Sequence, residues 1–337
     1  MNYFHSHKVF RLESGQTLEQ VKIAYHSYGQ MNADKSNVVW VCHPLSANSD
    51  VLDWWPSLFG DGKCFDPKEH FIICANFLGS HYGTTGPLSI NPKTNEPYFH
   101  SFPEFTIRDM VKLHILLADH LNIDKIDTLI GGSMGGHQAL EWAVMQADRI
   151  KNLCAIACSA VISPWASALN HSQRMAIACD PTWKENDVDA GREGMKVARS
   201  MALLSYRNQD AYNKTQSEDL FDKVYPSKPS SYQEHQGNKL SDRFNAYSYW
   251  YVSRAMDSQN LGRRRGDLQN VLARIKAKTL IVSIEKDLLF PQDEQEFLAD
   301  HIKGAQVEMI PSDYGHDGFL IEGAKIGKLI RLENVGV

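Results

Sequence analysis

The run at residues 129–137, Leu-Ile-Gly-Gly-Ser-Met-Gly-Gly-His, constrains the fold of this chain more than any other stretch. It holds Gly-x-Ser-x-Gly, with Gly131, Ser133 and Gly135 in the fixed places, between an apolar strand-like run and a helical pattern. A strand that turns so sharply into a helix leaves no room for a side chain at either flanking glycine. The serine is then held in strained geometry with its oxygen exposed. The motif therefore makes Ser133 a candidate nucleophile at a strand–helix turn.

Short apolar runs alternate with helical patterns along the chain, which favours a mostly parallel sheet flanked by helices. These runs are rich in Val, Ile and Cys with little alternation, as is typical of strands buried on both faces. The clearest expected strands cover residues 37–42, 71–75, 128–131, 153–158, 279–284 and 307–310. Apolar residues at helical spacing predict helices over 107–121 and 136–145.

A long gap separates the expected strand that ends near residue 160 from the one that starts at 279. It is too long for a single crossover helix, and its pattern is helical, with many Tyr, Met and charged residues. We therefore expect a helical lid over 163–276, inserted into a core formed by 1–162 and 277–337. Within the lid, the Ser- and Pro-rich stretch 225–231 is expected to be a loop.

Composition excludes several classes of protein. The 337 residues are 43% hydrophobic and 22% charged, with a net charge of −5, which is ordinary for a globular protein and argues against nucleic-acid or anionic-membrane partners. We find no apolar run near the roughly 18 residues of a membrane span, and the N-terminus lacks the apolar core of a secretory signal. Most cysteines lie in apolar runs without metal-ligand spacing, so we expect reduced thiols, no metal and a cytoplasmic location.

A serine nucleophile needs a base within hydrogen-bond reach, and the base needs an acid to orient it. After an elbow of this kind the acid and then the histidine follow late strands. Asp287 follows the expected strand 279–284, and His316 follows the last expected strand. Glu285 and Asp313 are the competing acids, but the first lies at the end of the strand and the second follows the wrong strand. The order predicts a Ser133–His316–Asp287 triad.

Acyl transfer also needs two backbone N–H donors for the oxyanion. One should follow the serine, which is Met134, and the other should lie in the loop after strand 37–42. Pro44 has no N–H, so we assign the second donor to Leu45. His43, in the same loop, is expected to be structural rather than a catalytic base.

At this point the residues resemble the homoserine O-acetyltransferase family of the α/β-hydrolase superfamily, and the chain is expected to have the α/β-hydrolase fold with an inserted lid. The resemblance rests on Gly-Ser-His-Tyr-Gly-Thr-Thr-Gly-Pro-Leu-Ser-Ile-Asn-Pro at 79–92, Phe-Thr-Ile-Arg-Asp-Met-Val at 105–111, the elbow at 131–143, lid segments at 198–207 and 236–246, and Asp-Leu-Leu-Phe-Pro and Gly-His-Asp-Gly-Phe-Leu at 287–291 and 315–320. Three departures lie outside the triad: the loop 43–48, where a small residue and a glycine are frequent, Asn245, where aspartate is common, and Gly318, where alanine is common.

The resemblance implies a ping-pong transfer of acetyl from acetyl-CoA to the side-chain hydroxyl of L-homoserine, a step of methionine biosynthesis, with no cofactor beyond the co-substrate. The acceptor is a zwitterion, so Asp317 is expected to meet its ammonium and Arg199 its carboxylate. Tyr206 follows Arg199 by seven residues, which places both on one helical face. Arg174 and Arg207 are alternatives for the carboxylate.

Other interpretations share the same triad. A serine esterase or hydrolase is one, and a homoserine or serine O-succinyltransferase is another. Because the loop 43–48 offers no Lys or Arg to a succinyl carboxylate, acetyl is favoured. A non-catalytic binding protein would usually lack part of the triad. The basic run 263–265 is a candidate contact for the CoA phosphates, and the Tyr-, Met- and Trp-rich lid suggests a homodimer.

Overall fold

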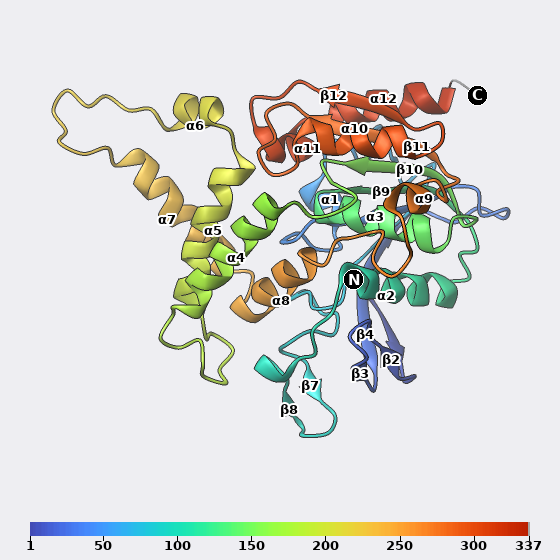
Figure 1. Ribbon diagram of the computed structural model, residues 1–337, viewed down its shortest axis with the longest axis horizontal. Helices are drawn as coiled ribbons and strands as arrows, with labels where there is room; N and C mark the ends of the chain where they lie inside the picture. Colours follow the sequence, from blue (N-terminus) through green and yellow to red (C-terminus); the bar gives the residue numbers. More distant parts are fainter. Residues whose placement is uncertain (336–337) are drawn as a thin grey trace.

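An eight-stranded, mostly parallel sheet runs through the protein, which the computed structural model describes over residues 1–335 (Figure 1). Its order is β1-β4-β6-β5-β9-β10-β11-β12. From β6 to β12 all neighbours are parallel, whereas β4 runs antiparallel to both β1 and β6. The strands are β1 (Asn2–Ser6), β4 (Val21–Tyr28), β5 (Val38–Cys42), β6 (Phe71–Ala75), β9 (Ile126–Gly132), β10 (Ile150–Ile156), β11 (Lys278–Ile284) and β12 (Gln306–Ile310). The predicted parallel sheet is confirmed, and β1 and β4 were not predicted.

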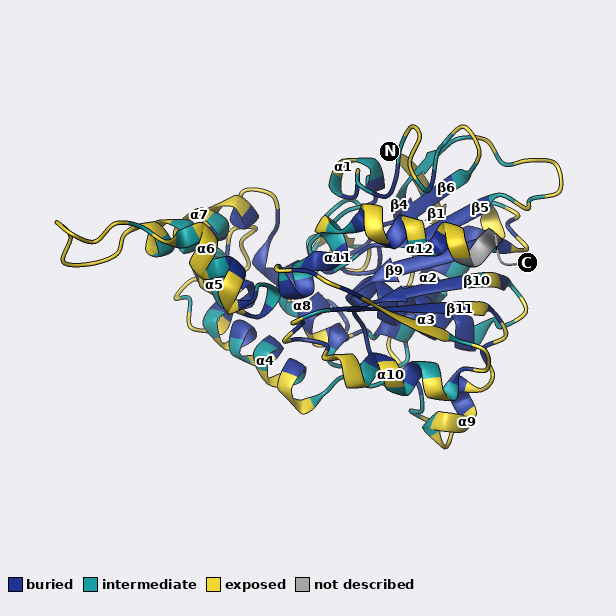
Figure 2. Cartoon of the chain, turned by 90° about the horizontal axis from the view of Figure 1, so that it is seen from above, coloured by how far each residue is buried: buried dark blue, intermediate teal, exposed yellow. Residues whose placement is uncertain are grey.

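The central strands are buried on both faces, and β5 shows why their sequences do not alternate. The edge strand β12 is exposed at every position except Ile310. Val38, Trp40 and Cys42 belong to one hydrophobic core, while Val39 and Val41 belong to the other. All five side chains are fully buried. Burying a side chain of this size stabilises a fold by about 1.5–3 kcal/mol, so both faces demand apolar residues. Figure 2 shows the central strands as the dark, buried middle of the molecule.

Helices cover each face of the sheet. Helices α2 (Ile107–His120), α3 (Met134–Met145), α9 (Leu268–Leu272) and α10 (Gln292–His301) contribute to the first core, and α1 (Val51–Trp54), α11 (Gly318–Ile321) and α12 (Gly323–Val335) lie with the second. Two small two-stranded sheets lie outside the main one: β2 (Phe10–Arg11) with β3 (Thr17–Leu18), and β7 (Ile90–Asn91) with β8 (Glu96–Pro97). A Thr106–Asp109 capping box begins α2.

The chain between β10 and β11 forms a helical projection beside the sheet (Figure 1). Its helices are α4 (Pro164–Ala178), α5 (Arg192–Tyr206), α6 (Gln209–Gln216), α7 (Lys228–Ser241) and α8 (Ala246–Met256). The expected loop at 225–231 is wrong in its second half, because α7 begins at Lys228. Pro229 lies in the first turn, where its missing N–H costs nothing.

The chain enters and leaves this projection through one neck. Val161 and Asn260 form an antiparallel bridge. It is flanked by hydrogen bonds from Ile162 N–H to the Gln259 carbonyl and from Leu261 N–H to the Ala160 carbonyl, at 2.9 and 3.1 Å. Helix α9 follows the neck and packs on α10 at the sheet. We therefore propose that the lid covers 163–258, ending before the expected boundary at 276.

Candidate active site

Ser133 lies between the end of β9 and the start of α3, with φ 57° and ψ −128°. This positive φ is unusual for a residue with a side chain and marks local strain. A Cβ built on Gly131 would lie 2.2 Å from the Gly135 carbonyl oxygen, and one on Gly135 would lie 2.0 Å from that of Cys42. Both distances are impossible, so the backbones approach as closely as the sequence motif requires.

The structure brings Ser133, His316 and Asp287 together from three separate turns. His316 Nε2 is 2.8 Å from Ser133 Oγ, and His316 Nδ1 is 2.7 Å from Asp287 Oδ2. The second carboxylate oxygen of Asp287 accepts hydrogen bonds from the N–H groups of Leu289 and Phe290, at 2.7 and 3.0 Å. With Nδ1–H donating to Asp287, Nε2 is left to accept the serine proton. The group has the geometry of a base-activated nucleophile.

Neither competing acid reaches His316. The backbone N–H of Glu285 bonds the Ile310 carbonyl at the end of the strand, and Asp313 is an exposed residue 3.9 Å from Lys286 Nζ. His43 is fully buried against Phe77, and burial lowers its pKa to about 4. It is therefore a neutral, buried side chain of the loop that follows β5.

Two opposing effects set the pKa of His316. Burial of the ring lowers it, but the charge of Asp287 and its hydrogen bond more than offset burial and raise the pKa above its usual value. Ser133, His316 and Asp287 are all buried, with exposed fractions of 7%, 3% and 6%. A shielded imidazole with an anionic partner is suited to taking and returning one proton.

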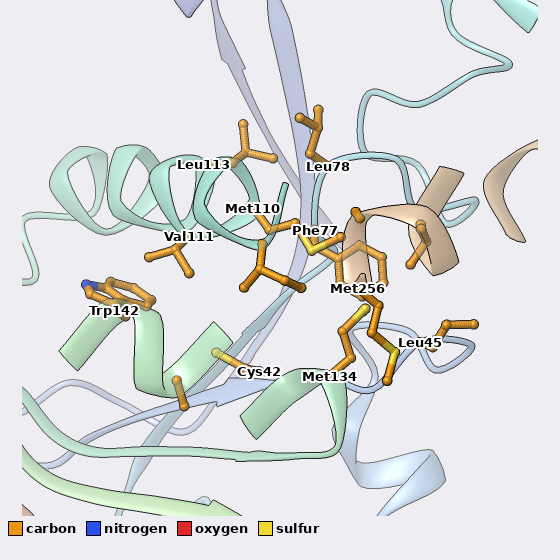
Figure 3. Packing of buried hydrophobic residues seen from close by; sticks show 14 of the residues in the cluster. Cys42, Leu45, Phe77, Leu78, Met110, Val111, Leu113, Met134, Trp142 and Met256 are labelled. Atoms are coloured by element: carbon orange, nitrogen blue, oxygen red, sulfur yellow. The ribbon is translucent and has the colours of Figure 1, made fainter. Parts of the chain in front are cut away.

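The expected oxyanion donors flank the serine on two neighbouring backbones. Leu45 lies in the loop after β5, and Met134 is the first residue of α3. Within residues 1–335 neither backbone N–H donates a hydrogen bond to another protein group. Figure 3 shows both side chains in the same buried cluster, beside Phe77 and Met256. The side chains anchor the two segments while the N–H groups stay unused.

The three expected acceptor residues lie around His316. The Tyr206 ring centre is 5.8 Å from that of His316, and the Arg199 guanidinium lies 5.5 Å from the Tyr206 ring centre. Asp317 follows His316 directly, and its pKa is raised by burial, although Arg207 and Arg199 partly offset the effect. One carboxylate and nearby guanidinium groups thus lie beside the imidazole.

The two alternative arginines have different surroundings. Arg174 is 5% exposed and pairs with Asp257, so its charge is used within the lid. Arg207 Nε lies 2.8 Å from Asp317 Oδ2, and its guanidinium lies over the Tyr314 ring. Arg199 has no such carboxylate partner among the side chains of residues 1–332, which leaves it the freer cation beside the site.

Comparisons with known proteins identify the family of the chain. The sequence profile of the alpha/beta hydrolase fold matches residues 37–322. The homoserine O-acetyltransferase of Cyclobacterium marinum is 42% identical over 336 residues, which cover 99% of this chain and 95% of that protein. The chain belongs to the homoserine O-acetyltransferase family of the α/β-hydrolase fold. It is an enzyme by this relationship.

Solved structures of similar fold include more than one activity. A crystal structure of homoserine O-acetyltransferase from Bacillus anthracis superposes with a TM-score of 0.88 at 25% identity, covering 97% of this chain and 96% of that one. The crystal structure of an esterase also superposes with a TM-score of 0.88 at 25% identity, covering 98% of both chains. Fold likeness alone therefore does not separate transfer from hydrolysis.

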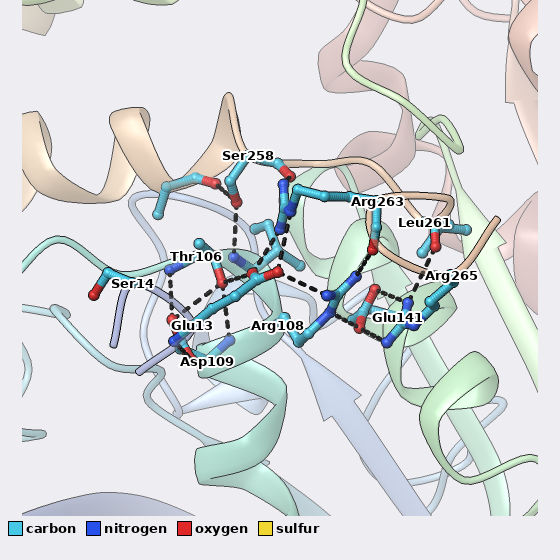
Figure 4. A network of polar contacts seen from close by, with 12 residues as sticks. Glu13, Ser14, Thr106, Arg108, Asp109, Glu141, Ser258, Leu261, Arg263 and Arg265 are labelled. Carbon is cyan, nitrogen blue, oxygen red and sulfur yellow. Dashed lines mark hydrogen bonds and ion pairs between the residues drawn. The ribbon is translucent and has the colours of Figure 1, made fainter. Parts of the chain in front are cut away.

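Two arginines of the basic run 263–265, the candidate contact for the CoA phosphates, form ion pairs within the protein. Arg263 makes a two-pronged contact with Glu13, at 3.1 and 2.7 Å. Arg265 pairs with Glu141, which also holds Arg108 at 2.9 Å (Figure 4). These arginines join the N-terminal segment, α2, α3 and the chain after the neck, so they serve the fold. Arg264 is exposed and takes no part in this network.

Sequence reasoning missed two polar interactions near the three residues Ser133, His316 and Asp287. One is the ion pair between Arg207 and Asp317. The other is the pair of hydrogen bonds that the Gln138 side chain donates to backbone carbonyl oxygens. The position of Gln138, one turn after Met134, was the available signal. Among residues 1–335 we find no group of three or more His, Cys, Asp or Glu side chains that could bind a metal. In the same part of the chain, no helix is long and apolar enough to cross a bilayer.

Proposed function

We propose that this enzyme transfers an acetyl group from acetyl-CoA to the side-chain hydroxyl of L-homoserine through an acyl-enzyme on Ser133, as a step of methionine biosynthesis. The observation that carries the proposal is the hydrogen-bonded Ser133–His316–Asp287 chain in a member of this family. No metal or cofactor is required.

In the first half-reaction His316 Nε2 takes the proton of Ser133 Oγ as the oxygen attacks the thioester carbonyl carbon. The carbonyl oxygen becomes an oxyanion, which the N–H groups of Leu45 and Met134 stabilise in this proposal. When the carbon–sulfur bond breaks, the CoA sulfur leaves with the proton from His316. Asp287 stabilises the imidazolium throughout.

In the second half-reaction His316 accepts the proton of the homoserine hydroxyl, whose oxygen attacks the acyl carbon. The ester bond to Ser133 breaks, and Ser133 Oγ recovers the proton. Asp317 supports this proposal as the anionic group beside His316 for the acceptor ammonium, and Arg199 as the cation for its carboxylate. Tyr206 lies between Arg199 and the imidazole and can contribute its hydroxyl.

A hydrolase acting on small esters is the second candidate, because an esterase superposes over nearly the whole chain. Mixing the enzyme with acetyl-CoA alone, and with homoserine, serine or water as acceptor, separates the candidates. We expect one acetyl group on the Ser133 peptide by mass spectrometry and O-acetylhomoserine as product. CoA release that is indifferent to homoserine would make the protein a hydrolase, and faster transfer from succinyl-CoA would overturn the acetyl assignment.

We also propose a cytoplasmic homodimer. All six cysteines are unpaired, which suits a reducing compartment. The segment between α6 and α7 exposes Leu220, Phe221, Val224 and Tyr225, with Phe221 91% accessible. Apolar side chains gathered in this way usually mark a contact surface. Light scattering of the wild type and of Phe221→Ser would test it, and a monomeric wild type would reject it.

A further inference from the structure

We propose that Gln138 is a positioning residue that joins the two halves of the oxyanion hole. Its side-chain Nε2 lies 3.3 Å from the His43 carbonyl oxygen and 3.2 Å from the Met134 carbonyl oxygen. His43 belongs to the loop that carries the Leu45 N–H, and Met134 supplies the other donor. One amide group therefore connects the two backbone segments that must hold a single oxygen atom. This inference rests on the proposed acyl transfer at Ser133, but not on the identity of the acceptor.

The position of Gln138 on α3 explains how one side chain reaches both segments. It lies one turn after Met134, and helical side chains point back toward the N-terminus of their helix. Gln138 is fully buried, so no water competes with its two acceptors. The start of α3 is already fixed against β5 by the close approach of Gly135 to the Cys42 carbonyl. Beyond Cys42 the chain turns into the loop, where the His43 ring packs on Phe77 and the His43 carbonyl oxygen accepts the hydrogen bond from Gln138.

The oxygen atom of the Gln138 amide supports a positioning role for its nitrogen atom. Gln138 Oε1 is buried and accepts no hydrogen bond within residues 1–335. A buried polar atom without a partner is destabilising, and an apolar side chain of similar shape would avoid that cost. Packing alone therefore does not account for an amide here. The two bonds from Nε2 do, because an oxyanion hole works only when its donors are about 2.7–3.1 Å from the developing charge.

The test compares Gln138→Met with Gln259→Met. Gln259 is a matched control because it is 2% exposed and its Nε2 also contacts two carbonyl oxygens, those of Ser159 and Ala160, at 3.1 and 3.5 Å. These carbonyls belong to the lid neck and not to the oxyanion loop. Each variant loses two contacts from a buried side-chain amide to backbone carbonyl oxygens. Gln138→Asn, which keeps the amide but is too short to reach both carbonyls, is a second and milder variant.

Three quantities are measured: the rate of Ser133 acylation by p-nitrophenyl acetate, the KM for that ester, and the affinity for a trifluoromethyl ketone, which forms a tetrahedral oxyanion on the serine. We expect Gln138→Met to slow acylation by at least about tenfold and to weaken the ketone by a similar factor, since donor alignment acts on the oxyanion. KM, taken from the dependence of the acylation rate on ester concentration, should change less than about twofold, because binding of the ground-state ester does not depend on the hole. Gln259→Met should leave all three values near the wild type, and Gln138→Asn should follow Gln138→Met with a smaller change.

Several outcomes would overturn the inference. It fails if both Gln138 variants acylate within about twofold of the wild type, if only KM changes, or if Gln259→Met causes the same loss. A wild-type enzyme that is not acylated on Ser133 would instead reject the proposed function. Normal wild-type acylation with unaffected Gln138 variants would reject this inference alone.

Discussion

Arg207 Nε lies 2.8 Å from Oδ2 of Asp317, the residue that follows His316 in the chain. Arg207 is at the C-terminal end of lid helix α5, so this ion pair joins the lid to the loop that carries the base. Both side chains are partly buried, with exposed fractions of 26% for Arg207 and 16% for Asp317. The lid thus influences the pKa of Asp317, the carboxylate next to His316.

We predict that Asp317→Asn raises the KM for homoserine strongly and spares Ser133 acylation. Losing one partner of a buried charge contact costs about 2–5 kcal/mol. The check is a comparison of homoserine KM with the acylation rate measured from acetyl-CoA alone. Equal loss of both would mean that Asp317 serves the triad rather than the acceptor. Arg199→Ala should behave in the same way.

Arg207→Gln should move the acid limb of kcat/KM for homoserine to higher pH. Burial raises the pKa of Asp317, and Arg207 is the first group that offsets it. An ammonium needs the ionised carboxylate, so binding is lost as pH falls through the pKa of Asp317. Removing Arg207 raises this pKa further. Arg254→Gln is the control, since Arg254 Nε is also 2.8 Å from a carboxylate, that of Glu104, and lies over Trp250. An unchanged profile in Arg207→Gln would contradict the coupling.

Asp287→Asn should slow acylation by about 10³–10⁴-fold, the size of effect that a triad acid has elsewhere. The base must be neutral, so wild-type acylation falls as pH drops through the raised pKa of His316. Without Asp287 the pKa of His316 falls, so the acid limb of the residual activity should move to lower pH. Burst kinetics of CoA release across pH give both values. Asp313→Asn is the matched control, and a similar loss there would reassign the acid.

Glu141→Gln should destabilise the fold. The Glu141 side chain is 3% exposed and holds both Arg108 and Arg265. Breaking a buried ion pair from one side costs about 3–5 kcal/mol, because the remaining charges stay buried. Urea unfolding would measure the loss. Asp119→Asn removes an ion pair from a 59% exposed carboxylate and should change the unfolding free energy little. Equal stability of the two variants would show that the network in Figure 4 is not a stabilising one.

Buried histidines should make the fold sensitive to acid. Burial lowers the pKa of His114 to about 3, and neighbouring His43 adds to the shift. The unfolded chain then binds a proton that the folded chain refuses, so stability falls once pH drops below about 6.5. By pH 5 this one residue should cost about 2 kcal/mol. His114→Leu should therefore lose less stability between pH 7 and pH 5 than the wild type. His171→Leu, an exposed position on α4, should not differ from the wild type.

The sequence predicted those parts of the fold in which every residue suits the same environment, such as a strand that is buried on both faces. Strands such as β5 carry apolar residues at every position because both faces are buried. In the edge strand β1 only Ser6 is buried, so its sequence contains no apolar run that would predict a strand. The turn around Ser133 is fixed by local sterics, and the chain order then narrowed the choice to Asp287 and His316. The contacts of Gln138 and Arg207 depend on segments far apart in sequence, which no local pattern records. The lid boundary expected at 276 differs from the one proposed at 258, because α9 is helical but packs on α10 at the sheet.

The neck at Ala160–Ile162 and Gln259–Leu261 is the place where the chain enters and leaves the lid, although lid side chains such as Arg207 also contact the core. Since both connections leave the sheet side by side, a short turn joining them would close the chain without moving β10 or β11. Evolution could therefore have replaced the whole helical insert while the strands and their turns kept folding around the same nucleophile. A protein engineer could do the same, by grafting foreign helices onto this neck to give an unchanged reaction centre a new choice of substrate.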